Sequence, residues 1–143
     1  MQSSSTHQNL QDALSQNAFH AIALFRNGKP LDGIAYLESS LSHNENSADY
    51  ALLSDFYHAL QNMPKALSAI KYAWELDPHN IAVQLKLVNL FLEAESYEFC
   101  KECLEKIDPD QYESEIQFEY FYLYAKVLQK LKSYEIYINF NLI

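Results

Sequence analysis

Two cysteines form the motif Cys100-Lys-Glu-Cys103, whose spacing is found in redox pairs and in half of many zinc sites. A structural zinc site needs four ligands, and the sequence contains neither a second CxxC nor an HxxxH. A thioredoxin-like pair would require a preceding strand and a βαβ context, which the pattern around Cys100 does not provide. The sequence therefore predicts that the cysteines are structural and that no metal is bound.

Other catalytic constellations are also missing from the sequence. It has no GxSxG, no glycine-rich phosphate loop and no HExxH. Carboxylates such as Glu102, Glu105 and Asp110 fall at surface positions of expected helices. The histidines do not pair at ligand spacing and have no nucleophile nearby in the pattern: His7, His20, His43, His58 and His79. We therefore expect a protein that is not an enzyme and has no cofactor.

The composition indicates a globular helical protein with an acidic surface. Hydrophobic residues make up 49% and charged residues 20% of the 143 residues, and only two glycines are present. The formal net charge of −9 disfavours nucleic acid and anionic membranes as partners, since both need a basic face. The first residues lack the pattern of a secretory signal, and there is no run of about 18 apolar residues. We expect a cytoplasmic location and no membrane partner.

The helical elements are clearest in the central stretch from Ala48 to Asn80, which predicts helices over Ala48–Leu60 and Pro64–Leu76. One face of the first helix has the spacing i, i+3, i+4 and i+7, with Tyr50, Leu53, Ser54 and Tyr57. The second helix repeats this kind of spacing with Ala66, Ile70 and Ala73. Pro64 suits a first helical turn, and Pro78 follows the end of the second helix.

This pattern resembles the tetratricopeptide repeat (TPR), W-x2-L-G-x2-Y, then A-x3-F, then P. Here it reads Tyr50-x2-Leu53-Ser54-x2-Tyr57, then Ala66-x3-Ile70, then Pro78. Equivalent residues recur one repeat length later, at Leu87, Val88, Phe91, Cys100 and Leu104. The resemblance covers about residues 14–137 in three to four repeats. It implies an all-α, right-handed stack of antiparallel helix pairs, a TPR-like α-solenoid.

The flanking segments complete the expected repeats. We predict helices over Asn9–Arg26 and Pro30–Leu41, with Gly33 at the position equivalent to Ala66. Further helices are expected over Glu113–Lys130 and from Tyr134 onward. The face of the helix over Glu113–Lys130 that packs inward is predicted to contain Phe121, Tyr124, Ala125 and Leu128. The domain prediction is a flexible segment over 1–8 and one TPR-like helical repeat domain over 9–143, whose last helix is incomplete.

The last residues, INFNLI, are apolar where this repeat family normally has a polar capping helix. We expect that this segment docks on a partner or on a second copy, giving a homo-oligomer, or that the chain is a piece of a longer protein.

The resemblance also implies which residues face a partner, because the first helices of stacked pairs line a concave surface. The expected contact residues are Ile22, Phe25, Ala51, Asp55, His58, Leu85, Asn89, Leu92, Tyr122 and Lys126. Some proteins of the family hold acidic C-terminal tails through a clamp of basic and amide side chains. Four of the five matching positions here, Ala18, Ile22, Leu52 and Ala82, cannot hold a carboxylate, which leaves only Lys86.

The sequence thus predicts a non-enzymatic protein–protein interaction module that binds an apolar-anchored peptide or helix in a concave groove. It would act as an adaptor, as a scaffold or as a chaperone similar to the small bacterial chaperones of secreted hydrophobic proteins. Two alternatives stay open. The chain is a repeat-module fragment of a larger multidomain enzyme such as a glycosyltransferase, or it is a self-assembling structural protein.

Overall fold

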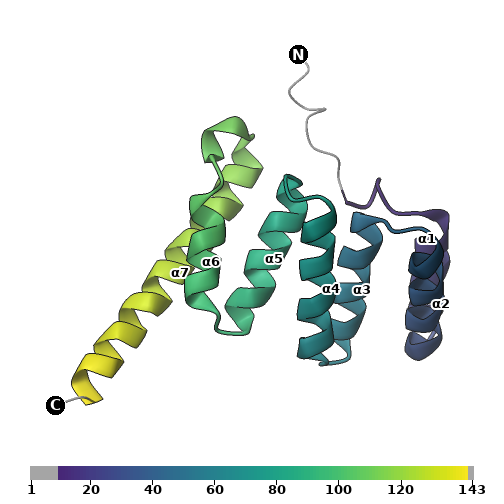
Figure 1. Ribbon diagram of the computed structural model, residues 1–143, viewed down its shortest axis with the longest axis horizontal. Coiled ribbons are helices and arrows are strands. Elements are labelled where there is room, and N and C mark those ends of the chain that lie inside the picture. The colour runs from purple at the N-terminus through teal and green to yellow at the C-terminus, as the bar shows by residue number, and fades with distance from the viewer. Residues whose placement is uncertain (1–9, 142–143) are drawn as a thin grey trace. The chain divides into compact units, whose positions relative to one another are not determined.

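The computed structural model describes residues 10–141, and within this range every regular element is helical (Figure 1). The chain forms two compact units, Met1–Leu87 and Val88–Ile143, and helix α5 (Ile81–Glu93) runs from the first into the second. The prediction of an all-α protein is confirmed for this part of the chain. The expected flexible segment over 1–8 lies outside the described residues. None of the helices in residues 10–141 is both long and apolar enough to cross a membrane.

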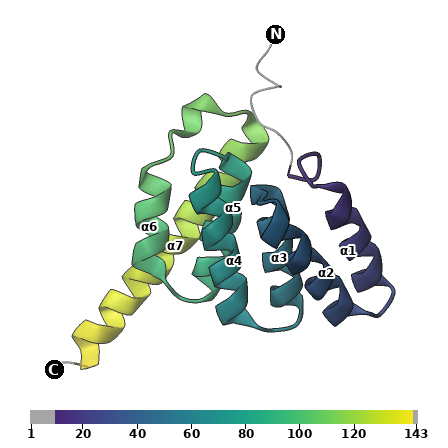
Figure 2. The same cartoon turned by 45° about the vertical axis from the view of Figure 1, so that its right-hand side comes forward.

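The first unit contains two pairs of neighbouring helices, α1 with α2 and α3 with α4 (Figures 1 and 2). Their bounds are α1 Gln16–Arg26, α2 Pro30–His43, α3 Ser47–Ala59 and α4 Met63–Leu76. Proline stands in the first turn of α2 and of α4, as the sequence predicts. Leu37 of α2 and Ile70 of α4 are completely buried, so each pair contributes large apolar side chains to the core.

The predicted start of the first helix at Asn9 is wrong, because α1 begins at Gln16 and a turn occupies the residues just before it. Ser15 caps α1, and its hydroxyl oxygen accepts a hydrogen bond from the Ala18 amide at 3.1 Å. Ser15 in turn donates to the buried carboxylate of Asp49 on α3, from its amide at 3.0 Å and from its hydroxyl at 2.5 Å. These bonds fix the chain in a non-helical conformation at Ser15 and so set where α1 begins.

Small residues allow the two helices of each pair to approach closely. Gly33 on α2 lies against the backbone of α1, where a Cβ added to it would be only 2.8 Å from the carbonyl oxygen of Ala21. In the next pair, Ala66 is completely buried, and Ser54 donates a hydrogen bond to the Ala66 carbonyl at 2.8 Å. Gly33 and Ala66 therefore occupy the equivalent helix contact, as their alignment in the repeat pattern predicts.

The second unit contains the last part of α5, together with α6 (Tyr97–Glu105), the short 3₁₀ helix η2 (Pro109–Gln111) and α7 (Ser114–Asn141). Helices α6 and α7 lie side by side, and the last turns of α7 extend beyond the first turn of α6 (Figures 1 and 2). Tyr120 on α7 is buried and donates a hydrogen bond to the carbonyl of Leu104 on α6 at 3.2 Å. This bond satisfies a buried phenol between the two helices.

The prediction of two separate C-terminal helices is wrong, because α7 is one helix of 28 residues. The predicted break between Lys130 and Tyr134 contains Leu131, Lys132 and Ser133, and none of these is a glycine or a proline. Without a residue that ends a helix, the backbone hydrogen bonds continue through this segment.

The predicted inward face of α7 is also wrong. Phe121 and Leu128 are 57% and 47% exposed, whereas Leu123 and Val127 are buried. The cause is the spacing of the first helices: α7 begins at Ser114, 33 residues after the start of α5 at Ile81, whereas the predicted face assumes the repeat length of roughly 34 residues. The packing positions on α7 therefore lie one residue earlier than predicted, at Tyr120, Leu123 and Val127.

Candidate functional site

The two cysteines lie on α6 and belong to the packing of unit 2. Both are free thiols, Cys100 is completely buried, and its Sγ donates to the carbonyl of Val88 at 3.4 Å. Burial raises the pKa of the Cys100 thiol to about 12, with a smaller contribution from Cys103. A thiol that stays protonated at neutral pH is a poor nucleophile and a poor metal ligand. Within residues 10–141, no group of three or more His, Cys, Asp or Glu side chains could hold a metal ion.

In unit 1 the structure buries several of the predicted contact residues. Ala51 and Leu85 are 1% and 3% exposed, so they contribute to the core rather than to an open surface. The ring of Phe25 on α1 stacks on Phe56 of α3, with centroids 4.4 Å apart and planes 13° from parallel. Phe25 and Ile22 are half-buried. These apolar side chains are therefore largely occupied by contacts within the protein.

The predicted polar contacts of unit 1 lie at its surface. Asp55 on α3 accepts two hydrogen bonds from the ammonium of Lys86 on α5, at 2.7 and 3.0 Å. Both side chains are partly exposed, and such a pair contributes only about 0–1 kcal/mol to stability. His58, one turn further along α3, is exposed. Lys86 is the one basic residue at the positions of a clamp for acidic C-terminal tails. Its charge is here neutralised by the neighbouring carboxylate of Asp55.

In unit 2 the structure brings three of the predicted residues together. Asn89, Leu92 and Lys126 line one open hollow of about 430 Å³ at the surface. Leu92 is buried, whereas Asn89 is exposed. We call this site the polar hollow, and its full lining is Asn89, Leu92, Glu93, Glu95, Tyr97, Lys126 and Lys130. Its lining combines two lysines, two glutamates and an amide with the side chains of Leu92 and Tyr97.

The rim of the polar hollow at Glu95 depends on the turn between α5 and α6. Glu95 has a left-handed backbone with φ 64°, and its amide donates to the Leu92 carbonyl at 3.0 Å. The next amide, that of Ser96, donates to the carbonyl of Phe91 at 2.9 Å. These bonds close the last turn of α5 and place Glu95 and Tyr97 beside its end.

The fourth predicted contact residue of unit 2, Tyr122, lies on the exposed side of α7. Its side chain is 55% exposed, as the sequence predicts, and the Lys126 ammonium lies 5.2 Å from its ring centroid. Phe118, one turn earlier, has its ring parallel to that of Tyr122 with centroids 6.5 Å apart. Tyr124, predicted to point inward, is half-buried, and its hydroxyl donates to Glu105 at 3.4 Å.

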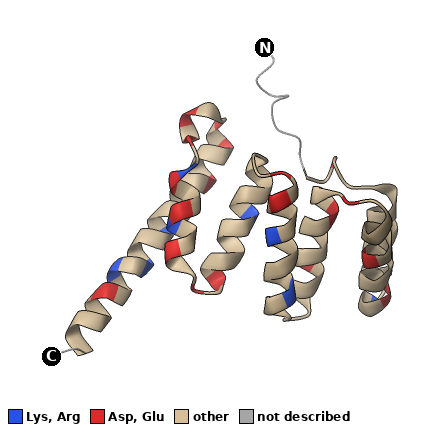
Figure 3. Cartoon of the chain, in the orientation of Figure 1, with Lys and Arg blue, Asp and Glu red and all other residues tan. Residues whose placement is uncertain are grey.

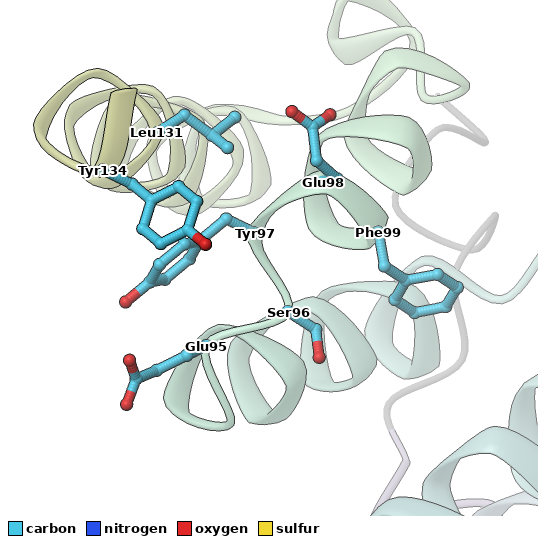
Figure 4. Close-up of a pocket in the computed structure, with 7 residues that line it drawn as sticks. All are labelled: Glu95, Ser96, Tyr97, Glu98, Phe99, Leu131 and Tyr134. Carbon is cyan, nitrogen blue, oxygen red and sulfur yellow. The ribbon is translucent and has the colours of Figure 1, made fainter. Parts of the chain in front are cut away.

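A second hollow of about 480 Å³ adjoins the turn between α5 and α6 and was not predicted (Figure 4). Tyr134 and Leu131 of α7 lie on one side of it, and Tyr97 comes from the start of α6 (Figure 4). Burial raises the pKa of Tyr97, and the nearby Glu95 raises it further, so the phenol stays protonated and can donate a hydrogen bond. Tyr97 lines both hollows.

Sequence reasoning missed Glu95, Tyr97 and Lys130 as parts of the site. A signal for Glu95 was available, because it follows Gln61 by 34 residues (95 − 61) and both residues have a positive φ. No family model and no curated protein matches the chain.

Proposed function

We propose that the chain is a non-enzymatic protein-interaction module of the tetratricopeptide-repeat type, whose polar hollow binds a peptide segment of another protein. The first support is a turn that recurs between the helices of each pair. Gly28, Gln61 and Glu95 all have left-handed backbones, with φ of 81°, 60° and 64°. Successive members of this set are separated by the length of one repeat, which is roughly 34 residues in this family.

The second support is a contact that recurs inside the helix pairs. The Ser54 hydroxyl donates across its pair to the Ala66 carbonyl, and the Cys100 thiol donates across the next pair to the Val88 carbonyl. Val88 and Cys100 each follow Ser54 and Ala66 by one repeat length. The same two positions are thus joined by a hydrogen bond in both pairs, although the donor and the acceptor carbonyl exchange helices. Equivalent packing of this kind is expected when one structural unit is repeated along a chain.

A third support is the helix cap. Asn46 caps α3 by accepting a hydrogen bond from the Asp49 amide at 3.2 Å, and Asn80 accepts from the Val83 amide at 3.2 Å at the start of α5. The two caps are also separated by one repeat length. Asparagine is among the best N-cap residues, so both first helices begin for the same local reason.

One observation carries the binding proposal: Asn89, Leu92 and Lys126, which the repeat alignment predicts as contact residues, line the same hollow. An exposed amide both donates and accepts hydrogen bonds, so Asn89 can pair with the backbone of an extended peptide. Lys126 and Lys130 can bind peptide carboxylates, and Glu93 and Glu95 favour a basic group beside them. The ligand we propose is therefore a polar peptide of mixed charge, rather than the apolar-anchored peptide that the sequence alone predicts.

This revision follows from burial. Leu85 and Leu92 are 3% and 7% exposed and cannot enter a pocket on a partner. The polar groups of the hollow remain as the recognition elements. We propose an adaptor role that involves neither nucleic acid nor a membrane surface, in keeping with the formal net charge of −9.

The test is selection from a displayed library of random peptides, followed by binding measurements on purified protein. We expect the selected peptides to lose at least about tenfold in affinity with Asn89→Ala or Lys126→Ala, as for central contacts of an interface. Lys71→Ala, on the exposed surface of α4, is the matched control and should bind like the parent protein. Failure to select any peptide, or equal losses with all three variants, would contradict the proposal.

A further inference from the structure

The outward face of α7 carries side chains at the spacing of a helix-pairing seam. Phe118, Tyr122, Ala125, Gln129 and Lys132 are separated alternately by four and three residues, and Glu115 precedes them at the same spacing. All six are exposed, Phe118 and Tyr122 by 74% and 55%. We call this set the α7 stripe. It lies on the side of the helix away from the buried Leu123 and Val127.

We propose that a second copy of this chain covers the α7 stripe, with α7 packed antiparallel on its counterpart around a twofold axis. In this register Tyr122 faces Ala125 of the partner subunit, so a large ring meets a small side chain. Phe118 faces Gln129 of the partner subunit, and Glu115 faces Lys132 of the partner subunit. The twofold axis makes each pairing twice, as in any interface that uses one patch of both copies.

Charge complementarity indicates that the α7 stripe is covered by a second copy of the chain. The acidic residues of the stripe region, Glu115 and Glu119, precede its basic residues, Lys126 and Lys132, along the helix, so α7 carries both signs (Figure 3). Reversing one copy therefore brings acidic residues opposite basic ones at both ends of the seam. In a parallel pair, Glu115 would instead lie near Glu115 of the partner subunit and Lys132 near Lys132 of the partner subunit. These like charges would repel each other.

The flanking residues select the register. In the proposed pairing, Glu119 lies beside Lys126 of the partner subunit on one flank, and Phe121 lies beside Leu128 of the partner subunit on the other. Sliding one helix by one heptad in one direction would bring Glu119 beside Glu119 of the partner subunit. Sliding it in the other direction would bring Lys126 beside Lys126 of the partner subunit. Only the proposed register pairs opposite charges and also buries the exposed rings of Phe118 and Phe121.

This inference does not depend on the proposed function, although Lys126 lies at the border of both surfaces because it lines the polar hollow and lies over Tyr122. The two proposals can be separated by changing Ala125, which is exposed and does not line the polar hollow. A variant at Ala125 should change self-association and leave the polar hollow intact.

The experiment is sedimentation equilibrium of the full chain over a range of concentrations. We expect a monomer–dimer equilibrium that Ala125→Glu weakens at least about tenfold, because it buries an unpaired charge in the centre of the seam. Ala35→Glu, the same change at an exposed alanine of α2, is the matched control and should dimerise like the parent protein. A protein that is monomeric throughout, or one whose dimer tolerates Ala125→Glu, would overturn the proposal.

Charge reversal tests the antiparallel register independently of the apolar contacts. Glu115→Lys and Lys132→Glu should each weaken the dimer, and the double variant should restore it, because the opposite charges then meet again with their signs exchanged. Circular dichroism confirms that each variant keeps its helices. If the loss of dimerisation free energy in the double variant equals the sum of the losses in the single variants, Glu115 and Lys132 do not face one another and the register is wrong.

Discussion

Gly33→Ala is predicted to destabilise unit 1, although alanine is the better helix former. The position lies on α2, where the backbone of α1 approaches most closely. A Cβ at Gly33 would lie 2.8 Å from the carbonyl oxygen of Ala21 and 3.2 Å from the amide nitrogen of Phe25. Both are backbone atoms inside α1, so they cannot move without shifting the whole helix.

Two opposing effects set the size of this change. Replacing glycine by alanine inside a helix gains about 1 kcal/mol. Forcing an extra methyl group into a packed contact typically costs about 1–3 kcal/mol. The contact at 2.8 Å is far inside van der Waals distance and involves rigid backbone, so we place the cost at the upper end of that range. The expected net loss in the free energy of unfolding is about 1–2 kcal/mol.

The assay is urea unfolding followed by tryptophan fluorescence. Trp74 is the one tryptophan of the chain and lies on α4, so its signal reports on unit 1. Ala35→Gly, at an exposed position of α2, measures the helix preference alone and should destabilise by about 1 kcal/mol. If Gly33→Ala instead stabilised the protein by as much as Ala35→Gly destabilises it, the close approach of α1 and α2 would be refuted.

Three further predictions concern the remaining contacts. Ser54→Ala should lower the free energy of unfolding by about 1 kcal/mol in the same urea assay, because the carbonyl of Ala66 loses its buried hydrogen-bond donor. An unchanged urea midpoint would contradict a stabilising bond between Ser54 and Ala66. Leu92→Ser should destabilise the protein by about 2–5 kcal/mol, as buried leucines do, and thermal melting measures this; a neutral result would mean that Leu92 is exposed after all. At neutral pH, Cys100 should be alkylated far more slowly in the folded protein than in the urea-unfolded chain, because burial raises the pKa of its thiol to about 12 and so removes the reactive thiolate. Mass spectrometry measures the two rates, and equal rates would exclude a buried Cys100.

The sequence predicts the helices of unit 1 well because their limits depend on local chemistry. Proline at the first turns of α2 and α4 and the periodic apolar faces of α3 and α4 are readable from neighbouring residues. The start of α1 is different, because it depends on Asp49, which is distant in the sequence and holds Ser15 in its capping conformation. A contact between such distant residues leaves no periodic signal near Ser15.

The errors in unit 2 have two sources: the expected break within α7 contains no residue that ends a helix, and the spacing from α5 to α7 differs from one repeat length. The repeat alignment assumes a constant offset of one repeat length, but α7 begins 33 residues after α5, and its buried face is Tyr120, Leu123 and Val127. The same limitation affects the candidate site. The alignment identifies Asn89 and Lys126 as residues of the polar hollow. It does not predict that Leu92 is buried, because burial depends on tertiary packing that residue spacing does not describe.

The most direct test of the binding proposal is nuclear magnetic resonance of the protein titrated with a selected peptide. The side-chain amide of Asn89 is a specific probe, because it lies in the polar hollow and is exposed. We predict that its resonances, with the backbone amides of Glu95 and Lys126, shift together and saturate at one peptide per chain. Shifts confined to α1–α4, with the Asn89 side chain unchanged, would contradict the proposal that this hollow is the binding site.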